Sequence, residues 1–476
     1  MSREAAVAAA LRYFDQGSLQ SVLQSRIAFR TESQASGRVA DLDAYLRIAI
    51  APYIEKLGFK SRIVSNSRSD CGPFLIGHRF EDENLPTVLI YGHGDTTLGN
   101  ESMWRSDLSP WILTIDGGRW YGRGSADNKG QHTINLSALE IAMANRGGRL
   151  GFNTILLLEM GEELGSPGLR EVCEKFKNEL SADVLIASDG PRVSAERPTL
   201  FLGGRGVVNF DLTVDLREKA HHSGNWGGLL RNPGTVLANA ISSIVDPRGR
   251  ILVPDFRPPA IPSRVRKALK NLTVGGERDD PKIDIDWGEP SLSNEERLYG
   301  WNALEVLTFQ TGDPERPQNA IPSRATARLQ LRFVVGTKRA DYVATLRDHL
   351  DRQGFPMVGV RPTKSEILSA TRLNLDDPWV KWALRSMAET TKTAPALLPN
   401  LGGSLPNELF ADVLGMPTLW IPHSYPACAQ HAPNEHMLAS VAREGLAIMT
   451  GLFWDIAEAG PDLVRQRRVS NATTVF

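Results

Sequence analysis

The chain has 476 residues, 41% of them hydrophobic and 23% charged, and at ~150 residues per domain this length predicts about two or three domains. Its 54 Lys and Arg balance 55 Asp and Glu, which argues against nucleic acid or an anionic membrane as a partner. Three widely spaced cysteines and the lack of any apolar run near ~18 residues favour a protein of the reducing cytoplasm.

Between residues 87 and 189, short apolar runs alternate with helical stretches, a pattern typical of α/β sheets. The runs at 87–91, 154–158 and 184–187 are expected to be strands that are buried on both faces. Polar residues follow the three runs: His93, Asp95, Glu162, Glu163 and Asp189. Because sites in open α/β sheets lie beyond the carboxyl ends of the strands, these side chains are expected to meet there.

The patterning changes after residue 204. Residues 210–216 and 325–333 alternate apolar with polar residues, as strands with one solvated face do, and they predict a second, α+β domain over 205–372. Within it, 251–320 is rich in Pro, Gly and charge and is expected to be an irregular insertion. The α/β pattern resumes over 373–476, so this segment is expected to complete the first domain, which begins with 1–204.

His93 and Asp95 are two positions apart in an extended segment, so their side chains point the same way. Asp95 can then hold His93 in one tautomer while the other ring nitrogen binds a metal. The simpler alternative is a hydrogen-bonding histidine at a strand end.

The glycine-rich turn at 122–130 carries Asp127 and opens a helix. Phosphate binding is the alternative, but no Gly-Lys-Ser/Thr ending follows and Asp127 would repel a phosphate. Glu162 and Glu163 are adjacent carboxylates, which repel each other unless one is protonated or a cation is shared, although a solvated surface pair is also common. Oxygen and imidazole ligands without thiolates suit Zn²⁺, Mn²⁺ or Co²⁺.

Over nearly the whole chain this series of motifs resembles the M20 family of dinuclear zinc peptidases and amidohydrolases. The matching segments are His93-x-Asp95, the turn around Asp127, Glu162-Glu163, Ser188-Asp189-Gly190, His222-Ser223-Gly224, Asn319-x-Ile321-Pro322, Gly402-Gly403-Ser404 and His431 to Glu435. The length and the segment 246–254 most resemble the carnosine and cytosolic nonspecific dipeptidase branch. The resemblance implies a mixed-sheet α/β catalytic domain of the zinc-peptidase type with an inserted α+β lid or dimerisation domain.

The resemblance also implies two divalent metal ions per subunit, with zinc preferred and manganese or cobalt as alternatives. His93, Asp127 and Asp189 would hold one ion. The second ion would be held by Asp127, Glu163 and His431, so that Asp127 bridges the pair. Glu162 would act as general base towards a metal-activated water, and Asp95 would orient His93.

The remaining roles that the resemblance implies concern the second domain and the substrate. His222 would reach the site of a partner subunit in a homodimer and stabilise the oxyanion there. Arg332 and Asn319 would bind the substrate carboxylate, and Gly403 and Ser404 would add donors at a helix N-terminus. Gly94, Thr96, Thr97, Asn400 and Leu401 depart from the family pattern, which puts the substrate preference in question.

The predicted activity is hydrolysis of a C–N amide bond in a dipeptide or short peptide with a free carboxylate. The alternative within the same chemistry is an N-acyl-amino-acid amidohydrolase, which differs in needing no free amine on the substrate. The alternative from another class is a catalytically inactive, dimeric binding protein, which the presence of every expected ligand and of Glu162 argues against.

Overall fold

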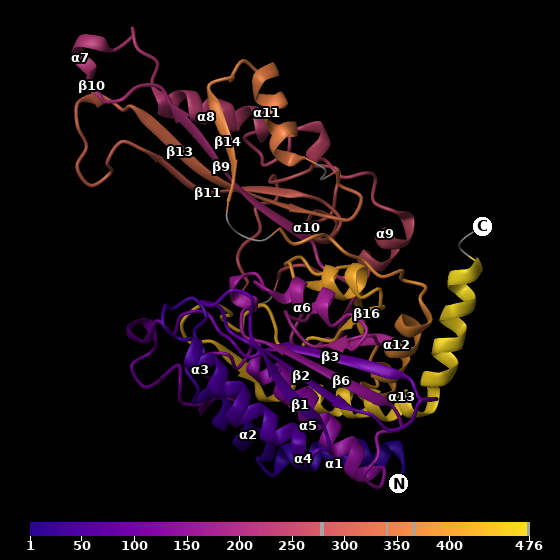
Figure 1. The fold of residues 1–476 in the computed structure, drawn as a ribbon. Helices are drawn as coiled ribbons and strands as arrows, with labels where there is room; N and C mark the ends of the chain where they lie inside the picture. Colours follow the sequence, from indigo (N-terminus) through magenta and orange to yellow (C-terminus); the bar gives the residue numbers. More distant parts are fainter. Residues whose placement is uncertain (277–279, 339–340, 364–366, 474–476) are drawn as a thin grey trace.

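The computed structural model describes residues 1–476 apart from 277–279, 339–340, 364–366 and 474–476. Figure 1 shows two bodies that are joined by several segments, with both chain termini in the larger one. The larger body contains an eight-stranded sheet and the smaller body a four-stranded sheet.

The eight-stranded sheet is mixed. Its spatial order is β1 (Lys60–Val64), β2 (Phe74–Arg79), β6 (Asn153–Glu159), β3 (Thr87–His93), β7 (Val184–Ala187), β16 (Thr418–Trp420), β8 (Thr199–Phe201) and β15 (Ala396–Leu398). The strands β6, β3, β7 and β16 are parallel, whereas β2 runs antiparallel to β6. The three strands expected between residues 87 and 189 are therefore confirmed, and their carboxyl ends lie at one edge.

Helices cover both faces of this sheet, which explains why its central strands are apolar throughout. In β3, Val88 and Ile90 pack into one core and Leu89 and Tyr91 into the other. The first core includes side chains from α1 (Arg3–Asp15), α2 (Ser18–Ile27), α5 (Lys129–Asn145), α12 (Pro378–Thr391) and α13 (Ala439–Thr473). The second includes α6 (Leu169–Lys175) and η5 (Leu409–Val413).

Shorter elements complete the larger body. They are α3 (Val39–Ala44), η1 (Tyr45–Ile50), α4 (Ala51–Lys56), η2 (Glu101–Met103), η3 (Glu162–Leu164), and a small sheet in the order β17 (His436–Leu438), β5 (Arg119–Tyr121) and β4 (Thr114–Asp116). None of the helices in the described part of the chain combines the length and the apolar character that a membrane span needs.

The smaller body is an antiparallel sheet with helices on one face. Its order is β11 (Ala303–Thr311), β13 (Arg324–Phe333), β9 (Gly206–Asp215) and β14 (Val358–Pro362). Alternate residues of β9 are buried against α8 (Pro233–Ile244) and α11 (Tyr342–Arg352), as the period of two predicts. At the end of this body farthest from the large sheet lie α7 (Ser223–Trp226) and the ribbon of β10 (His221–His222) and β12 (Ala320–Ile321) (Figure 1).

The segment 251–320 is not irregular throughout, contrary to the prediction. It contains η4 (Pro254–Phe256), α9 (Ser263–Leu269), α10 (Asn294–Tyr299) and the edge strand β11. Val265 and Leu269 lie four residues apart on one side of α9 and pack into the second core of the larger body. The insertion therefore ties the two bodies together.

Candidate metal centre and substrate cleft

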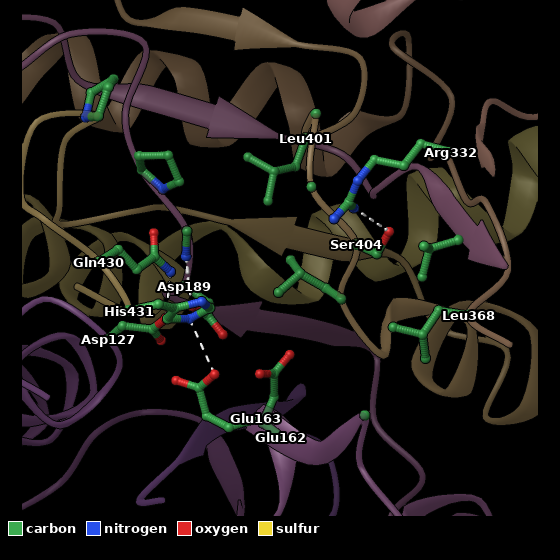
Figure 2. A pocket seen from close by; sticks show the side chains of 18 of the residues that line it. Asp127, Glu162, Glu163, Asp189, Arg332, Leu368, Leu401, Ser404, Gln430 and His431 are labelled. Atoms are coloured by element: carbon green, nitrogen blue, oxygen red, sulfur yellow. Dashed lines mark hydrogen bonds and ion pairs between the residues drawn. The ribbon is translucent and has the colours of Figure 1, made fainter. Parts of the chain in front are cut away.

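The acidic residues predicted from strand ends meet at the carboxyl edge of the large sheet (Figure 2). His93 ends β3, Glu162 and Glu163 follow β6, and Asp189 follows β7. Because these strands are parallel neighbours, residues far apart in the chain are brought into one cluster.

Two groups of three side chains in this cluster have metal-ligand geometry, with the ligand atoms of each group within 4.8 Å of one another. One group is His93, Asp127 and Asp189, and the other is Asp127, Glu163 and His431. His93 Nε2 lies 3.0 Å from Asp127 Oδ1, and His431 Nε2 lies 2.9 Å from Asp127 Oδ2. The two oxygens of Asp127 thus face different groups, as a bridging carboxylate requires.

Asp95 connects the histidine to the glutamate pair. Its Oδ1 lies 3.2 Å from His93 Nδ1, which leaves Nε2 of that ring facing Asp127. The two carboxylate oxygens of Asp95 also accept the backbone N–H groups of Glu162 and Glu163, both at 3.1 Å. The predicted orienting residue therefore also holds the turn that carries the proposed base.

Several carboxyl groups are buried close together at this edge of the sheet. Desolvation raises the pKa of Glu163 to about 7 and that of Asp189 to about 6, and the charge of Asp127 adds to both shifts. Desolvation likewise raises the pKa of Glu162 well above its ordinary value. In addition, Asp189 Oδ2 is buried without a hydrogen-bond partner. Bound cations would compensate all of these costs.

Two residues around Asp127 were assigned no role by the sequence reasoning. Buried Glu435 accepts the N–H groups of Ala126 at 2.9 Å and of Asp127 at 3.0 Å, and its other oxygen pairs with Arg123 Nη1 at 2.7 Å. The side-chain amide of Gln430 donates to Asp127 Oδ2. The sequence signal for both residues was their closeness to His431 in the chain, since they belong to the segment that carries this predicted ligand.

The cluster opens into a cleft with a volume of about 690 Å³. Arg332 of β13, Gly403 and Ser404 line the cleft, and Arg332 Nη1 donates to Ser404 Oγ at 3.1 Å. Arg332 Nε also donates to Gln330 Oε1 at 3.0 Å, so two hydrogen bonds fix the guanidinium. Three of the four predicted substrate-binding residues therefore lie in the same cleft as the metal-ligand groups.

His222 and Asn319 lie elsewhere in the same chain. His222 is exposed at the tip of the smaller body, with Nδ1 accepting the N–H of Gly224 at 3.1 Å. The backbone oxygen of Asn319 accepts the N–H of Ser223 at 2.9 Å, so Asn319 lies beside His222 and not beside Arg332. Within one chain the structure does not bring either residue to the cleft.

The mixed α/β fold, the two potential ligand groups and the adjacent carboxylate of Glu162 are the features of a metal-dependent hydrolase. Residues 89–455 match the family model described as Peptidase family M20/M25/M40, and the chain belongs to this family of peptide-bond hydrolases.

The proteins that this chain is similar to include several dipeptidases. The chain is 37% identical over 417 residues to the Cys-Gly metallodipeptidase dug1 of Schizosaccharomyces pombe, which covers 82% of the chain and 84% of that protein. It is 25% identical over 406 residues to human Beta-Ala-His dipeptidase, and this match covers 81% of the chain and 78% of that protein. The solved structure of the dipeptidase Dug1p from Saccharomyces cerevisiae superposes with a TM-score of 0.79 at 20% identity, covering 96% of this chain and 99% of that one.

Proposed function

We propose that this chain is a dinuclear metallodipeptidase that cleaves small peptides with a free α-carboxylate. The observation that carries the proposal is one cleft with two ligand groups sharing Asp127, with Glu162 beside them and Arg332 also in its lining. A cleft of about 690 Å³ has the size of a small-molecule site, as expected for a dipeptide. The names of the similar proteins support the same substrate class.

The residues fit two divalent ions. The five ligands are imidazoles and carboxylates without a thiolate, a set that favours zinc and also suits manganese or cobalt. Asp189 Oδ2, which is buried without a hydrogen-bond partner, and the crowded carboxylates are features expected of cation ligands. When bound, such ions supply Lewis acidity that polarises the scissile carbonyl and makes the attacking water more acidic.

The protein groups divide the remaining work. Glu162, whose pKa is raised by burial, takes the proton of the attacking water and passes it to the departing amine. Asp95 holds both His93 and the Glu162–Glu163 turn in place. Arg332 and Ser404, with the adjacent Gly403, bind the substrate carboxylate and so set the position of the scissile bond.

We also propose that the active protein is a homodimer in which His222 completes the site of the partner subunit. The edge strand β11 supports this assignment, because Val306, Leu307 and Phe309 are 42%, 49% and 45% exposed on it. An exposed apolar edge strand is a pairing surface. Asn319, beside His222, would reach the same partner site.

Mixing protomers tests the shared site. His222→Ala and Glu162→Ala proteins, each inactive alone, are mixed, unfolded and refolded together. A heterodimer contains one intact site in two, so random pairing should restore about a quarter of wild-type activity. As a control, each single variant is refolded with a His222→Ala/Glu162→Ala double variant. These mixtures should regain no activity, because no pairing contains an intact site. Failure to recover activity in a demonstrated heterodimer would contradict the shared site.

The cytoplasm remains our proposed location. Cys71, Cys173 and Cys428 are free thiols in the structure, and the last two are buried. Free thiols of this kind are compatible with a reducing compartment.

The activity itself is tested with matched substrates. Amine release by the Zn²⁺- or Mn²⁺-loaded protein is measured on dipeptides and on their N-acetylated counterparts. Cleavage of the free-amine set is expected, and Glu162→Ala should lower kcat by about 10²–10⁴-fold. Glu83→Ala, which removes an exposed loop carboxylate, is the matched control and should be fully active. Cleavage of the acetylated set alone would instead identify an N-acyl-amino-acid amidohydrolase.

A further inference from the structure

The part of the cleft around Arg332 has apolar walls. Val207, Leu298, Leu368, Leu401 and Leu405 line it. These residues come from separate segments that contact one another, since the N–H of Val207 donates to the backbone oxygen of Leu368 at 2.9 Å. In Figure 2, Leu401 and Leu368 are drawn on either side of the Arg332–Ser404 pair.

The charges of the cleft are concentrated at its other end. Among the described residues that line it, the acidic ones are Asp127, Glu162, Glu163 and Asp189, all in the metal centre. Arg192 also lines the cleft, but it is paired with Glu444. Among the described lining residues, therefore, none beside the apolar walls offers a carboxylate to a cationic substrate side chain. Arg332 is assigned to the main-chain carboxylate of the substrate and is not free to bind an acidic side chain.

The insertion supplies one of these walls. Leu298 belongs to α10, whose N-terminus is closed by a capping box between Ser293 and Glu296. The backbone oxygen of Tyr299 accepts a hydrogen bond from Asn400 Nδ2 at 3.0 Å. An added Cβ on Gly402 would lie only 3.2 Å from Leu298 Cδ1, so the helix packs closely on the loop that carries Ser404.

We infer that the enzyme selects dipeptides with a bulky apolar C-terminal residue, whose side chain packs against Leu298, Leu368 and Leu401 while Arg332 holds its carboxylate. This inference rests on the proposed function. It assigns the insertion a part in selecting the substrate, because Leu298 is the contribution of α10 to the cleft. Asn400 and Leu401 gain a role as well, since Leu401 lines the cleft and Asn400 Nδ2 donates to the backbone oxygen of Tyr299 in α10.

The test compares kcat/KM for Ala-Leu, Ala-Phe, Ala-Gly, Ala-Asp and Ala-Lys with the metal-loaded protein. Ala-Leu and Ala-Phe should exceed the other three by at least about tenfold, as burial of an apolar side chain predicts. Leu298→Ala should lower the Ala-Phe to Ala-Gly ratio several-fold, and Leu298→Asp should raise the Ala-Lys to Ala-Leu ratio. Ile285→Ala, at an 87% exposed site in the same insertion, should leave both ratios unchanged.

The outcomes separate the two proposals. A kcat/KM for Ala-Gly or Ala-Lys equal to that for Ala-Leu would overturn the proposed selectivity. The dipeptidase assignment would remain intact. Ratios that do not move in either Leu298 variant, with circular dichroism showing folded protein, would overturn the role of α10. Failure to cleave any of the five dipeptides would overturn both the selectivity and the proposed function.

Discussion

The buried carboxylate of Glu435 fixes the turn that presents Asp127 to both ligand groups. It accepts the backbone N–H groups of Gly124, Ala126 and Asp127 and is neutralised by Arg123. A bridging ligand must keep both oxygens aimed at different ions, so a small rotation of this turn would disturb both sites. In the proposed metal centre, Glu435 would therefore act through Asp127.

Glu435→Gln keeps the shape of the side chain but removes its charge from the buried pair with Arg123. We expect metal affinity to fall by about 10–100-fold, as for other supports of metal ligands, and the unfolding temperature to drop. Competition titration with a zinc indicator measures the affinity, and circular dichroism verifies that the protein is folded. Glu179→Gln removes a charge from the exposed pair with Arg62 and should bind metal normally. Wild-type affinity in folded Glu435→Gln would show that the turn holds without this charge.

Gly94 illustrates a residue whose role the sequence did not reveal. Its departure from the family pattern suggested altered substrate preference, yet it does not line the cleft. A Cβ at this position would lie 2.4 Å from Tyr45 Cε1 and 2.7 Å from Met160 Sδ. Tyr45 and Met160 of the core fill the space beside Gly94, so packing in this chain leaves no room for a larger side chain there. Contacts of this kind join residues that are far apart in the chain, so local sequence patterns do not reveal them.

At the scale of elements, the sequence predicted those strands whose faces are each either buried or solvated along the whole strand. The strands β3, β6 and β7 are buried on both faces and β9 on one, so their apolar periods were visible. The edge strand β11 was missed because most of its residues, apolar ones included, are exposed in the single chain. Its burial pattern therefore lacks the alternation by which a one-sided strand is predicted.

Charging the edge strand tests its proposed role. The double variant Leu307→Glu/Phe309→Glu should be monomeric in analytical ultracentrifugation, because like charges would face each other across the paired strands. Activity should fall by about 10²–10³-fold with the loss of the partner's oxyanion donor, while metal content stays unchanged. Ile115→Glu, at a 45% exposed site on β4, is the control and should remain dimeric and active. A dimeric double variant would place the interface elsewhere.

At the scale of the whole molecule, the residues that could be predicted to meet are those at the carboxyl ends of parallel strands, whatever the order of these strands in the sheet. His93, Glu163 and Asp189 each follow a strand of one parallel set, so their meeting follows from topology. Asn319 shows the limit, because the resemblance assigned it with Arg332 to the substrate carboxylate, whereas within one chain it lies beside His222 and outside the cleft that Arg332 lines. The contribution of Leu298 depends on how the insertion packs on the larger body, which local patterns do not encode.

Metal removal should destabilise the whole larger body, and more so at higher pH. Burial raises the pKa of Glu163 to about 7 and that of Asp189 to about 6 in the metal-free chain, above their ordinary values of 4.5 and 3.8. Between pH ~4 and 7 the folded metal-free protein therefore binds more protons than the unfolded chain, and its stability falls as the pH rises. Bound ions reverse this balance, since they favour the ionised carboxylates, and at free metal 100-fold above Kd each site adds about 2.7 kcal/mol. Calorimetry with and without a chelator should thus give a difference in unfolding temperature that grows from pH 5 to pH 7. A difference that is zero or shrinks over this range would mean that these carboxylates do not hold the metal.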